Sequence, residues 1–355
     1  MKQPSLFWKT APVVLLVALV AEACGPGASA SPSGAASQAA SASPSPSASA
    51  APTKLTVGLG FIPSVQFAQF YLAQSAGYYR DAGLDVTFQN KIDPDLITLV
   101  GQGSLDIGIA DGTSVIPAVA QGIPVRYVTT IYAQFPNVVY AKASSGIRTA
   151  ADLRGKKLGT PGKYGSSWIM LQALLGSAGL KPADLDIQLY PDFGQGAALA
   201  QGAVTAATGF VNNEPVQLEL SGTPAVVLHV DDTVPLPGNG LITGVDTLRT
   251  KRAALQAFVA ATLHAMADIT ADPQKGLDAA VAAVPDLGKD RATQLAILKA
   301  TVGTWSNAYT KANGAGAIDR SAWTATVAFM AGLADTPLPG SPPPVDQLVD
   351  DSLLK

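Results

Sequence analysis

KLTVGLGFIPSVQFAQFYLAQSAGYYRDAGLDVTFQ, residues 54–89, is the stretch that decides the fold. Apolar residues alternate from Leu55 to Leu59, as in a short strand, and recur at helical spacing from Val65 to Ala76. A second strand is predicted at Val86–Phe88. The stretch therefore predicts a β-loop-α-β unit whose aromatic loop lies at the carboxyl end of the first strand. Ligands of open α/β sheets bind at that edge.

The order of strand, loop and helix recurs along the chain and predicts a second set of such units. After a Pro- and Gly-rich break at Pro235–Gly240, one returning strand follows, and the pattern is helical from Arg252 onward. This order predicts two α/β lobes joined by two crossings, near Asn137–Tyr140 and Pro235–Leu241. The other expected strands are Leu105–Ala110, Val125–Ile131, Val138–Ala141, Lys156–Thr160, Ile187–Tyr190, Val204–Phe210, Ala225–Val230 and Leu241–Val245.

Composition narrows the class of protein. The 355 residues leave room for two lobes, and the formal net charge of −3 gives no basic footprint for nucleic acid. Only 14% of residues are charged, so the fold must depend on apolar packing more than on surface ion pairs.

The first 24 residues have the pattern of an export signal. Two lysines precede an apolar run of about 11 residues at Ala11–Ala21, too short for a membrane-spanning helix, which needs about 20. The run ends before Cys24, the only cysteine, in a context that resembles the bacterial lipobox, where the cysteine is acylated. A plain signal peptide cut nearby is the alternative. Residues 25–53 are almost entirely Ala, Ser, Pro and Gly, which predicts a disordered tether.

Four motifs occur in order between residues 61 and 215: FIPSVQFAQFYLAQSAGYYRDAGLDV, ADLRGKKLG, PGKYGSSW and GFVNNEP. Together they resemble the substrate-binding lipoproteins of ABC importers, in the group related to thiamine-pyrimidine synthases and sulfonate-binding proteins. The likeness covers roughly Lys54–Asp272. The Asn-Asn-Glu-Pro stretch and the aromatic first loop look most like binders of riboflavin or formylaminopyrimidine. Residues 204–206 read Val-Thr-Ala, where the family often has Val-Asp-Ala.

The resemblance implies an α/β, two-lobed clamp of the periplasmic-binding-protein type II, with the ligand in the cleft between the lobes. It implies a monomer, lipid-anchored at the extracytoplasmic face of the cell membrane, that hands its ligand to the transmembrane subunit of an ABC permease. Riboflavin is the first expected ligand and a thiamine-type pyrimidine the second. The expected organisation is a lipoprotein signal at 1–24, a tether at 25–53, lobe one at 54–138 and 240–355, and lobe two at 139–239.

Loops that follow strands in lobe one supply the first candidate ligand-binding residues. The ring of Phe61 can stack on a planar ligand, and Gln66 lies in the same loop region. Thr113 and Ser114 open a helix, where free N–H groups and hydroxyls can hold a polar ligand edge. Tyr132 follows the fourth strand. The alternative for Phe61 and Gln66 is core packing. For Thr113 and Ser114 it is a helix cap without ligand contact, and for Tyr132 it is a surface loop.

The matching loops of lobe two supply the remaining candidates. Tyr164, Ser166 and Trp168 place rings and a hydroxyl at a helix start, although Trp168 has burial as its alternative. Asn213 and Glu214 combine an amide, which donates and accepts, with a carboxylate that accepts paired N–H groups. Their alternative is a turn and a helix cap. The set predicts a flat, largely uncharged heterocyclic ligand.

Two other functions remain open at this point. A sulfonate- or nitrate-binding protein would need arginine or a denser set of hydroxyls on these loops, and no arginine falls there. A single-turnover synthase would resemble relatives that use histidine and a cysteine-rich motif, whereas His229 and His264 are the only histidines. We therefore expect no catalytic residue, cofactor or metal site.

Cys24→Ala should release the protein from the membrane into the soluble fraction, because the acylated cysteine is the expected anchor. Fractionation of cells that express either form measures this. A Cys24→Ala protein that stays with the membrane contradicts the anchor.

Overall fold

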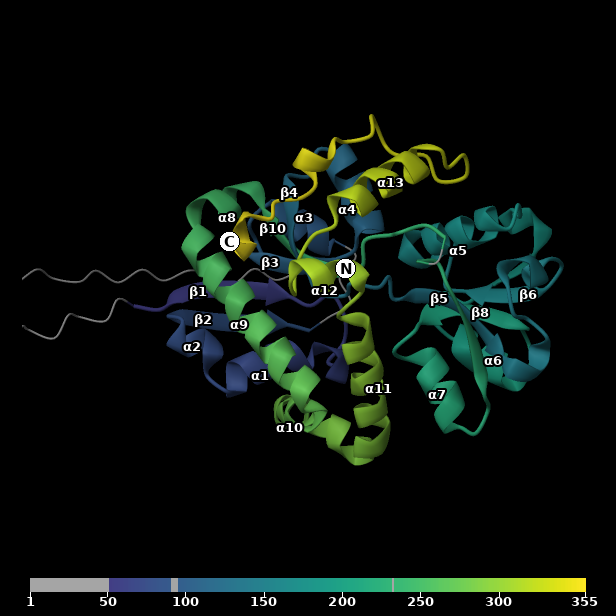
Figure 1. Ribbon diagram of the computed structural model, residues 1–355, viewed down its shortest axis with the longest axis horizontal. Helices are drawn as coiled ribbons and strands as arrows, with labels where there is room; N and C mark the ends of the chain where they lie inside the picture. The colour runs from purple at the N-terminus through teal and green to yellow at the C-terminus, as the bar shows by residue number, and fades with distance from the viewer. Residues whose placement is uncertain (1–50, 91–94, 232) are drawn as a thin grey trace, which may run out of the picture. The chain divides into compact units, whose positions relative to one another are not determined.

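A computed structural model describes residues 51–90, 95–231 and 233–355. The predicted export signal, Cys24 and nearly all of the tether lie outside these residues. Figure 1 shows the elements described below.

The first sheet confirms the predicted β-loop-α-β unit. β1 pairs with β2 in parallel from Thr53 opposite Leu84 to Gly58 opposite Gln89. A return strand, β10, is inserted antiparallel between β3 and β4. The strand order is β2-β1-β3-β10-β4, with bounds β1 (Thr53–Gly58), β2 (Leu84–Gln89), β3 (Ile107–Ala110), β4 (Val125–Thr130) and β10 (Gly240–Gly244).

The second sheet has the same number of strands and a similar plan. β6 is parallel to β7 and β8, whereas β5 runs antiparallel to β8 and β9. The predicted strands of this half are confirmed to within about two residues. The order is β7-β6-β8-β5-β9, with bounds β5 (Asn137–Lys142), β6 (Lys157–Thr160), β7 (Asp186–Leu189), β8 (Ala206–Phe210) and β9 (Ala225–His229).

Helices follow most strands, and a helical segment closes the chain as predicted. A 3-10 turn at Ala150–Leu153 begins with a capping box between Thr149 and Asp152. The α-helices are α1 (Ala68–Ser75), α2 (Tyr78–Asp81), α3 (Leu96–Gly101), α4 (Gly112–Ala120), α5 (Gly165–Ser177), α6 (Gln195–Gln201), α7 (Glu214–Leu220), α8 (Val245–Thr250), α9 (Arg252–Ala271), α10 (Pro273–Ala283), α11 (Arg291–Thr304), α12 (Ala308–Asn313) and α13 (Arg320–Ala331).

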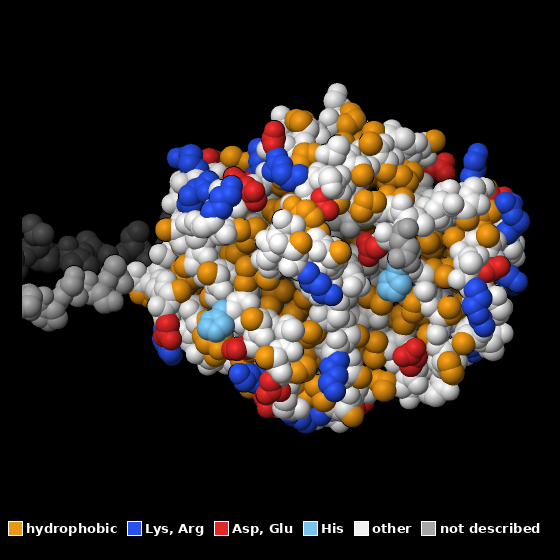
Figure 2. All heavy atoms as spheres, in the orientation of Figure 1, with side chains coloured by type: hydrophobic (Ala, Val, Ile, Leu, Met, Phe, Trp, Pro, Cys, Tyr) orange, Lys and Arg blue, Asp and Glu red, His pale blue; other side chains and the backbone are white. Residues whose placement is uncertain are grey.

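The core of the first half is built on aromatic packing between α1, α2 and α9. Tyr79 stacks on Phe258 with ring centroids 4.8 Å apart, and Phe70 stacks on the same ring at 6.3 Å. By length and composition α9 could cross a membrane, but it packs against α1 and α10 and buries residues along its length, as a core helix does. On the face drawn in Figure 2, acidic and basic side chains are mixed.

The C-terminal segment covers the open edge of the first sheet. The Tyr127 N–H of β4 donates to Leu348 O at 2.8 Å, and the Asp350 N–H donates back to Tyr127 O at 3.0 Å. β4 lies at the end of the strand order, so these bonds satisfy backbone groups that no other strand reaches.

The chain passes between the sheets at residues 131–136 and 230–239. The first crossing therefore precedes the expected Asn137–Tyr140, because Asn137 is already paired with Phe210 in the second sheet. The second falls largely where the Pro- and Gly-rich break predicts it. The division into lobe one, residues 54–138 and 240–355, and lobe two, residues 139–239, stays a proposal.

The two crossings are in direct backbone contact. Ile131 and Tyr132 both donate their N–H groups to Asn239 O, at 3.0 and 2.7 Å. A Cβ added to Gly238 would lie 2.3 Å from Tyr132 O and 2.9 Å from Gln134 O. Only glycine allows this approach, because backbone atoms on the facing crossing cannot move aside as a flexible side chain can.

Gly238→Ala should lower the free energy of unfolding by about 1–3 kcal/mol, the usual cost of overpacking. Gly176→Ala is the matched control: it lies in α5 with no atom within 4 Å of the added Cβ, so it should be neutral or gain up to about 1 kcal/mol. Chemical denaturation measures both. Equal stability of the two variants would contradict the close contact.

Candidate functional site

A cavity of about 900 Å³ lies between the facing edges of the two sheets. Parallel strands of both sheets end there, so the loops after β1, β3 and β8 contribute to its wall. β10 runs in the opposite direction, and its start therefore meets the same edge. The cavity is within the 300–1,000 Å³ range of small-molecule sites. Its polar lining residues are Gln66, Gln69, Asp111, Ser114, Asn213, Glu214, Gln217, Ser221 and Asn239.

Aromatic rings from both sheets line the cavity. Phe61, in the loop after β1, is 38% exposed, and Phe193, in the loop after β7, is 58% exposed. Exposed rings beside a cavity have no protein partner to cover them, which makes them available to a flat ligand. The other aromatic lining residues are Phe67, Tyr132, Tyr140 and Phe210.

Phe193 also has a strained backbone. Its φ is +61°, the one positive value outside glycine among the described residues. A phenylalanine in this region of φ/ψ space persists only where the surrounding structure enforces it, and such residues cluster at functional sites. The Phe193 N–H donates to Tyr190 O at 2.9 Å, which holds the turn.

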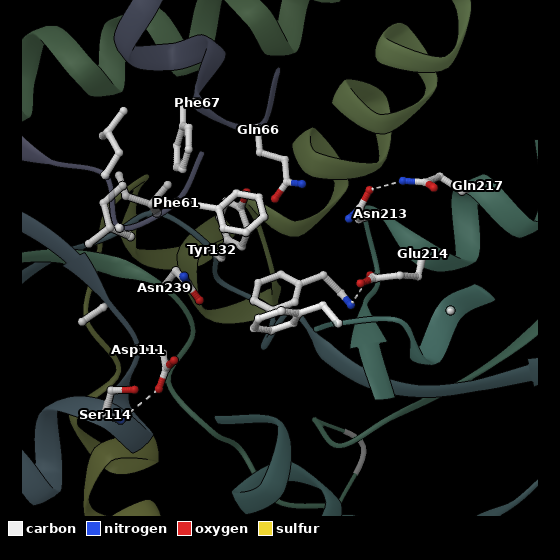
Figure 3. Close-up of a pocket in the computed structure, with 18 of the residues that line it drawn as sticks. Phe61, Gln66, Phe67, Asp111, Ser114, Tyr132, Asn213, Glu214, Gln217 and Asn239 are labelled. Carbon is white, nitrogen blue, oxygen red and sulfur yellow. Dashed lines mark hydrogen bonds between the residues drawn. The ribbon is translucent and has the colours of Figure 1, made fainter. Parts of the chain in front are cut away.

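Six of the ten residues predicted to bind ligand line the cavity: Phe61, Gln66, Ser114, Tyr132, Asn213 and Glu214. Figure 3 shows them around the same space. Their loops are far apart in sequence, so the prediction that strand ends bring them together agrees with the structure. Contact with a ligand stays a prediction for each of them.

Thr113 and Ser166 lie behind the wall instead of on it. The Thr113 hydroxyl donates to Asp111 Oδ1 at 2.6 Å, and the Ser166 hydroxyl donates to Asp111 Oδ2 at 2.5 Å. Both hydroxyls are therefore used to hold Asp111, which caps α4 by accepting the Ser114 N–H at 3.0 Å.

Tyr164 and Trp168 do not line the cavity, contrary to expectation. Trp168 is 3% exposed and packs in the core beneath the second sheet, with Lys163 Nζ 5.9 Å from its ring. The Tyr164 ring is 63% exposed and lies over Gly162. Trp168 lies in the first turn of α5 and packs in the core, whereas Tyr164 precedes the helix and is exposed.

Glu214 is a partly buried carboxylate of the wall. Its Oε2 accepts the Phe210 N–H at 2.8 Å, and burial raises the pKa of its carboxyl. A Cβ at Gly209 would lie 3.0 Å from Oε2, so glycine there leaves room for the carboxylate. Within the described residues, no lysine or arginine forms an ion pair with Glu214. The group is held by hydrogen bonds alone.

Asn213 and Tyr132 already have protein partners. Asn213 Oδ1 accepts from Gln217 Nε2 at 2.7 Å, which leaves its amide hydrogens for a ligand (Figure 3). Burial raises the pKa of Tyr132, so the phenol stays protonated. Asn212 Nδ2 is 3.4 Å from the Tyr132 hydroxyl and donates to Thr301 Oγ1 at 2.9 Å, which ties the loop after β8 to α11.

Sequence reasoning missed Phe193 and Asn239. Phe193 lies between β7 and α6, so it has the same strand-loop-helix signal that found Phe61. Asn239 directly precedes the return strand, and the antiparallel direction of that strand places its start, not its end, at the cavity. Its Oδ1 is buried without a hydrogen-bond partner in the described part of the chain, as is Gln69 Oε1.

Comparison with known proteins places this geometry in context. The chain is 33% identical over 292 residues to "Riboflavin-binding protein RibY" of Chloroflexus aurantiacus, which covers 80% of this chain and 83% of that protein. It is 29% identical over 175 residues to the yeast "4-amino-5-hydroxymethyl-2-methylpyrimidine phosphate synthase THI13", about half of either protein.

A solved structure supports the fold. The alkanesulfonate-binding protein SsuA from Xanthomonas axonopodis pv. citri, bound to MOPS, superposes with a TM-score of 0.63 at 20% identity, covering 85% of this chain and all of that one. The expected two-lobed α/β fold of solute-binding proteins is confirmed. The family model described as "NMT1/THI5 like" matches residues 64–276. The chain therefore belongs to the NMT1/THI5-like family.

Proposed function

We propose that this chain is the solute-binding protein of an ABC importer and that it captures riboflavin. The observation that carries the proposal is the cavity itself, which combines exposed aromatic rings from loops of both sheets with amide and carboxylate groups. A flat tricyclic ring with an edge of N–H and C=O groups fits that chemistry. The similarity to RibY over most of both chains supports the same ligand.

In this proposal Phe61 and Phe193 hold the ring system by stacking, at about 1–3 kcal/mol per stacked ring by analogy with bases. Asn213 and Glu214 pair with its polar edge. Leaving these groups unpaired in a closed cavity would cost about 1–3 kcal/mol each, so they set selectivity. The protein works at the extracytoplasmic face as a lipid-anchored monomer and delivers its ligand to the permease.

A thiamine-type pyrimidine is the second candidate. The similarity to pyrimidine phosphate synthases over 175 residues favours it. A pyrimidine is smaller and would leave more of the cavity open. Synthase chemistry has less support than binding, because His229 and His264 do not line the cavity.

Riboflavin should bind to the purified protein and lose fluorescence on titration. Phe193→Ala should weaken binding by roughly 5- to 150-fold, the equivalent of one lost stacking contact of about 1–3 kcal/mol. Tyr164→Ala, which removes a ring outside the cavity, should change the Kd less than twofold.

The same proteins separate the candidate ligands by thermal stabilisation, since a ligand at 100 times its Kd adds about 2.7 kcal/mol. A shift with a thiamine-type pyrimidine and none with riboflavin would select the second candidate. A shift with a sulfonate alone would contradict both, and a larger loss in Tyr164→Ala than in Phe193→Ala would contradict the assignment of the rings.

Glu214→Gln should stabilise the ligand-free protein at pH 7 by about 0.5–2 kcal/mol. Burial raises the pKa of Glu214, so the folded state binds the proton more tightly than the unfolded state. The stabilisation of the folded state by this proton is fully present below the pKa of about 4.3 that the carboxyl has in the unfolded state. It is lost as pH rises through the pKa of Glu214 in the folded state. Glutamine keeps an acceptor for the Phe210 N–H and carries no charge.

Thermal melts at pH 4 and pH 7 measure this effect. The extra stability of Glu214→Gln over the wild-type protein should be smaller at pH 4, where Glu214 is increasingly protonated. Glu219→Gln is the control, because it removes a carboxylate from an exposed position on the same helix. If Glu214→Gln lowers the stability at pH 7, the claim that burial disfavours the charged form of Glu214 is wrong.

A further inference from the structure

We propose that Asp111 excludes anionic ligands, so that the cavity accepts a neutral heterocycle and rejects its phosphorylated or sulfonated counterpart. The inference rests on the proposed function and adds the ionic form that the site selects. It starts from the position of one carboxylate, which lies on the cavity wall and is only 7% exposed.

The Asp111 carboxylate is fixed in place by donors from two helices. Oδ1 accepts from the Thr113 hydroxyl and the Ser114 N–H, both in the first turn of α4. Oδ2 accepts from the Ser166 hydroxyl, in the first turn of α5. The hydroxyl oxygens of Ser114 and Ser166 are themselves 3.3 Å apart. The carboxylate therefore joins the two helix starts and cannot swing away from the cavity without losing several hydrogen bonds.

The starts of α4 and α5 would otherwise attract an anion. Helix N-termini carry partial positive charge and free N–H groups, which favour phosphate, sulfonate or carboxylate groups. Here the chain supplies its own anion at the place where the two starts meet. Asp111 neutralises the positive potential of the two helix starts, and its carboxylate repels a ligand anion.

The rest of the lining offers an anion no compensation. Among the described lining residues Asp111 and Glu214 are the carboxylates, and none is Lys, Arg or His. The nearby Lys163 lies over Trp168, outside the cavity. Like charges repel more strongly in a cavity than in water, because the effective dielectric constant is lower.

The neighbouring groups favour a ligand that donates hydrogen bonds. Gly240 pairs with Ala110 in the antiparallel ladder, so Asn239 continues the register beside Asp111, as Figure 3 shows. Asn239 Oδ1 has no partner within the described residues. Hydroxyl or N–H groups of a neutral ligand can donate to Asp111, and to the Asn239 amide once its buried oxygen turns toward the cavity, whereas an ionised phosphate oxygen has only lone pairs to present.

Binding of riboflavin and of riboflavin 5′-phosphate to the full chain tests the inference. The wild-type protein should bind riboflavin at least about 100-fold more tightly than riboflavin 5′-phosphate. Asp111→Asn should reduce that ratio at least about tenfold, because asparagine keeps the helix cap and the shape but removes the charge. Asp290→Asn, which alters the cap of α11 outside the cavity, should leave the ratio within twofold.

Each outcome bears on a separate claim. Similar wild-type affinities for the two flavins would overturn the inference and leave riboflavin binding intact. A ratio unchanged in Asp111→Asn would show that shape, not this charge, excludes the phosphate, and would also overturn it.

If riboflavin does not bind at all, the proposed riboflavin-binding function is wrong. Thermal stabilisation by other ligands then tests whether Asp111 excludes anions. The ligands are then 4-amino-5-hydroxymethyl-2-methylpyrimidine, its phosphate and an alkanesulfonate. Stabilisation of Asp111→Asn, but not of wild type, by an anion supports the role of Asp111. Any other pattern, including no shift in either protein, counts against it.

Discussion

The insertion of β10 between β3 and β4 is the constraint on which the rest of the structure depends. All five residues of the strand are buried, and it pairs with a strand on either side. A Cβ at Gly240 would lie 2.2 Å from the Tyr127 ring, so the strand starts at a position that only glycine fits. Because β10 must return to the first sheet, the chain crosses twice, and its start brings Asn239 to the edge where β3 delivers Asp111.

Much of this organisation is readable from sequence, because strand periodicity and helix caps are local signals. Asp111 shows this well: its position before a helix predicts the cap that the structure contains. Trp168 and Phe193 show the limit. Local pattern places both near a strand end, but which of them faces the cavity depends on the rotation of α5 against its sheet and on one residue held at positive φ. Those features are fixed by tertiary packing, which no short stretch of sequence encodes.

The site departs from the rules that stabilise the rest of the chain. Elsewhere, acidic groups are mostly solvated or paired, as Asp106 is with Lys251 at 2.7 Å. Glu214 is partly buried beside glycine and held by a backbone N–H, and Gln69 and Asn239 keep unpartnered oxygens. Buried polar groups without partners destabilise a fold, and of the six such atoms in the described residues two, those of Gln69 and Asn239, belong to side chains of this cavity wall.

The C-terminal residues that pair with Tyr127 have a consequence for solubility and handling. β4 would otherwise present a row of free N–H and C=O groups, and such an edge invites strand addition from another molecule. Leu348 to Asp350 cap this edge within the chain itself. A fusion or proteolytic cut that detaches these few residues would leave the residues that line the cavity in place and would expose a sheet edge open to strand addition from another molecule.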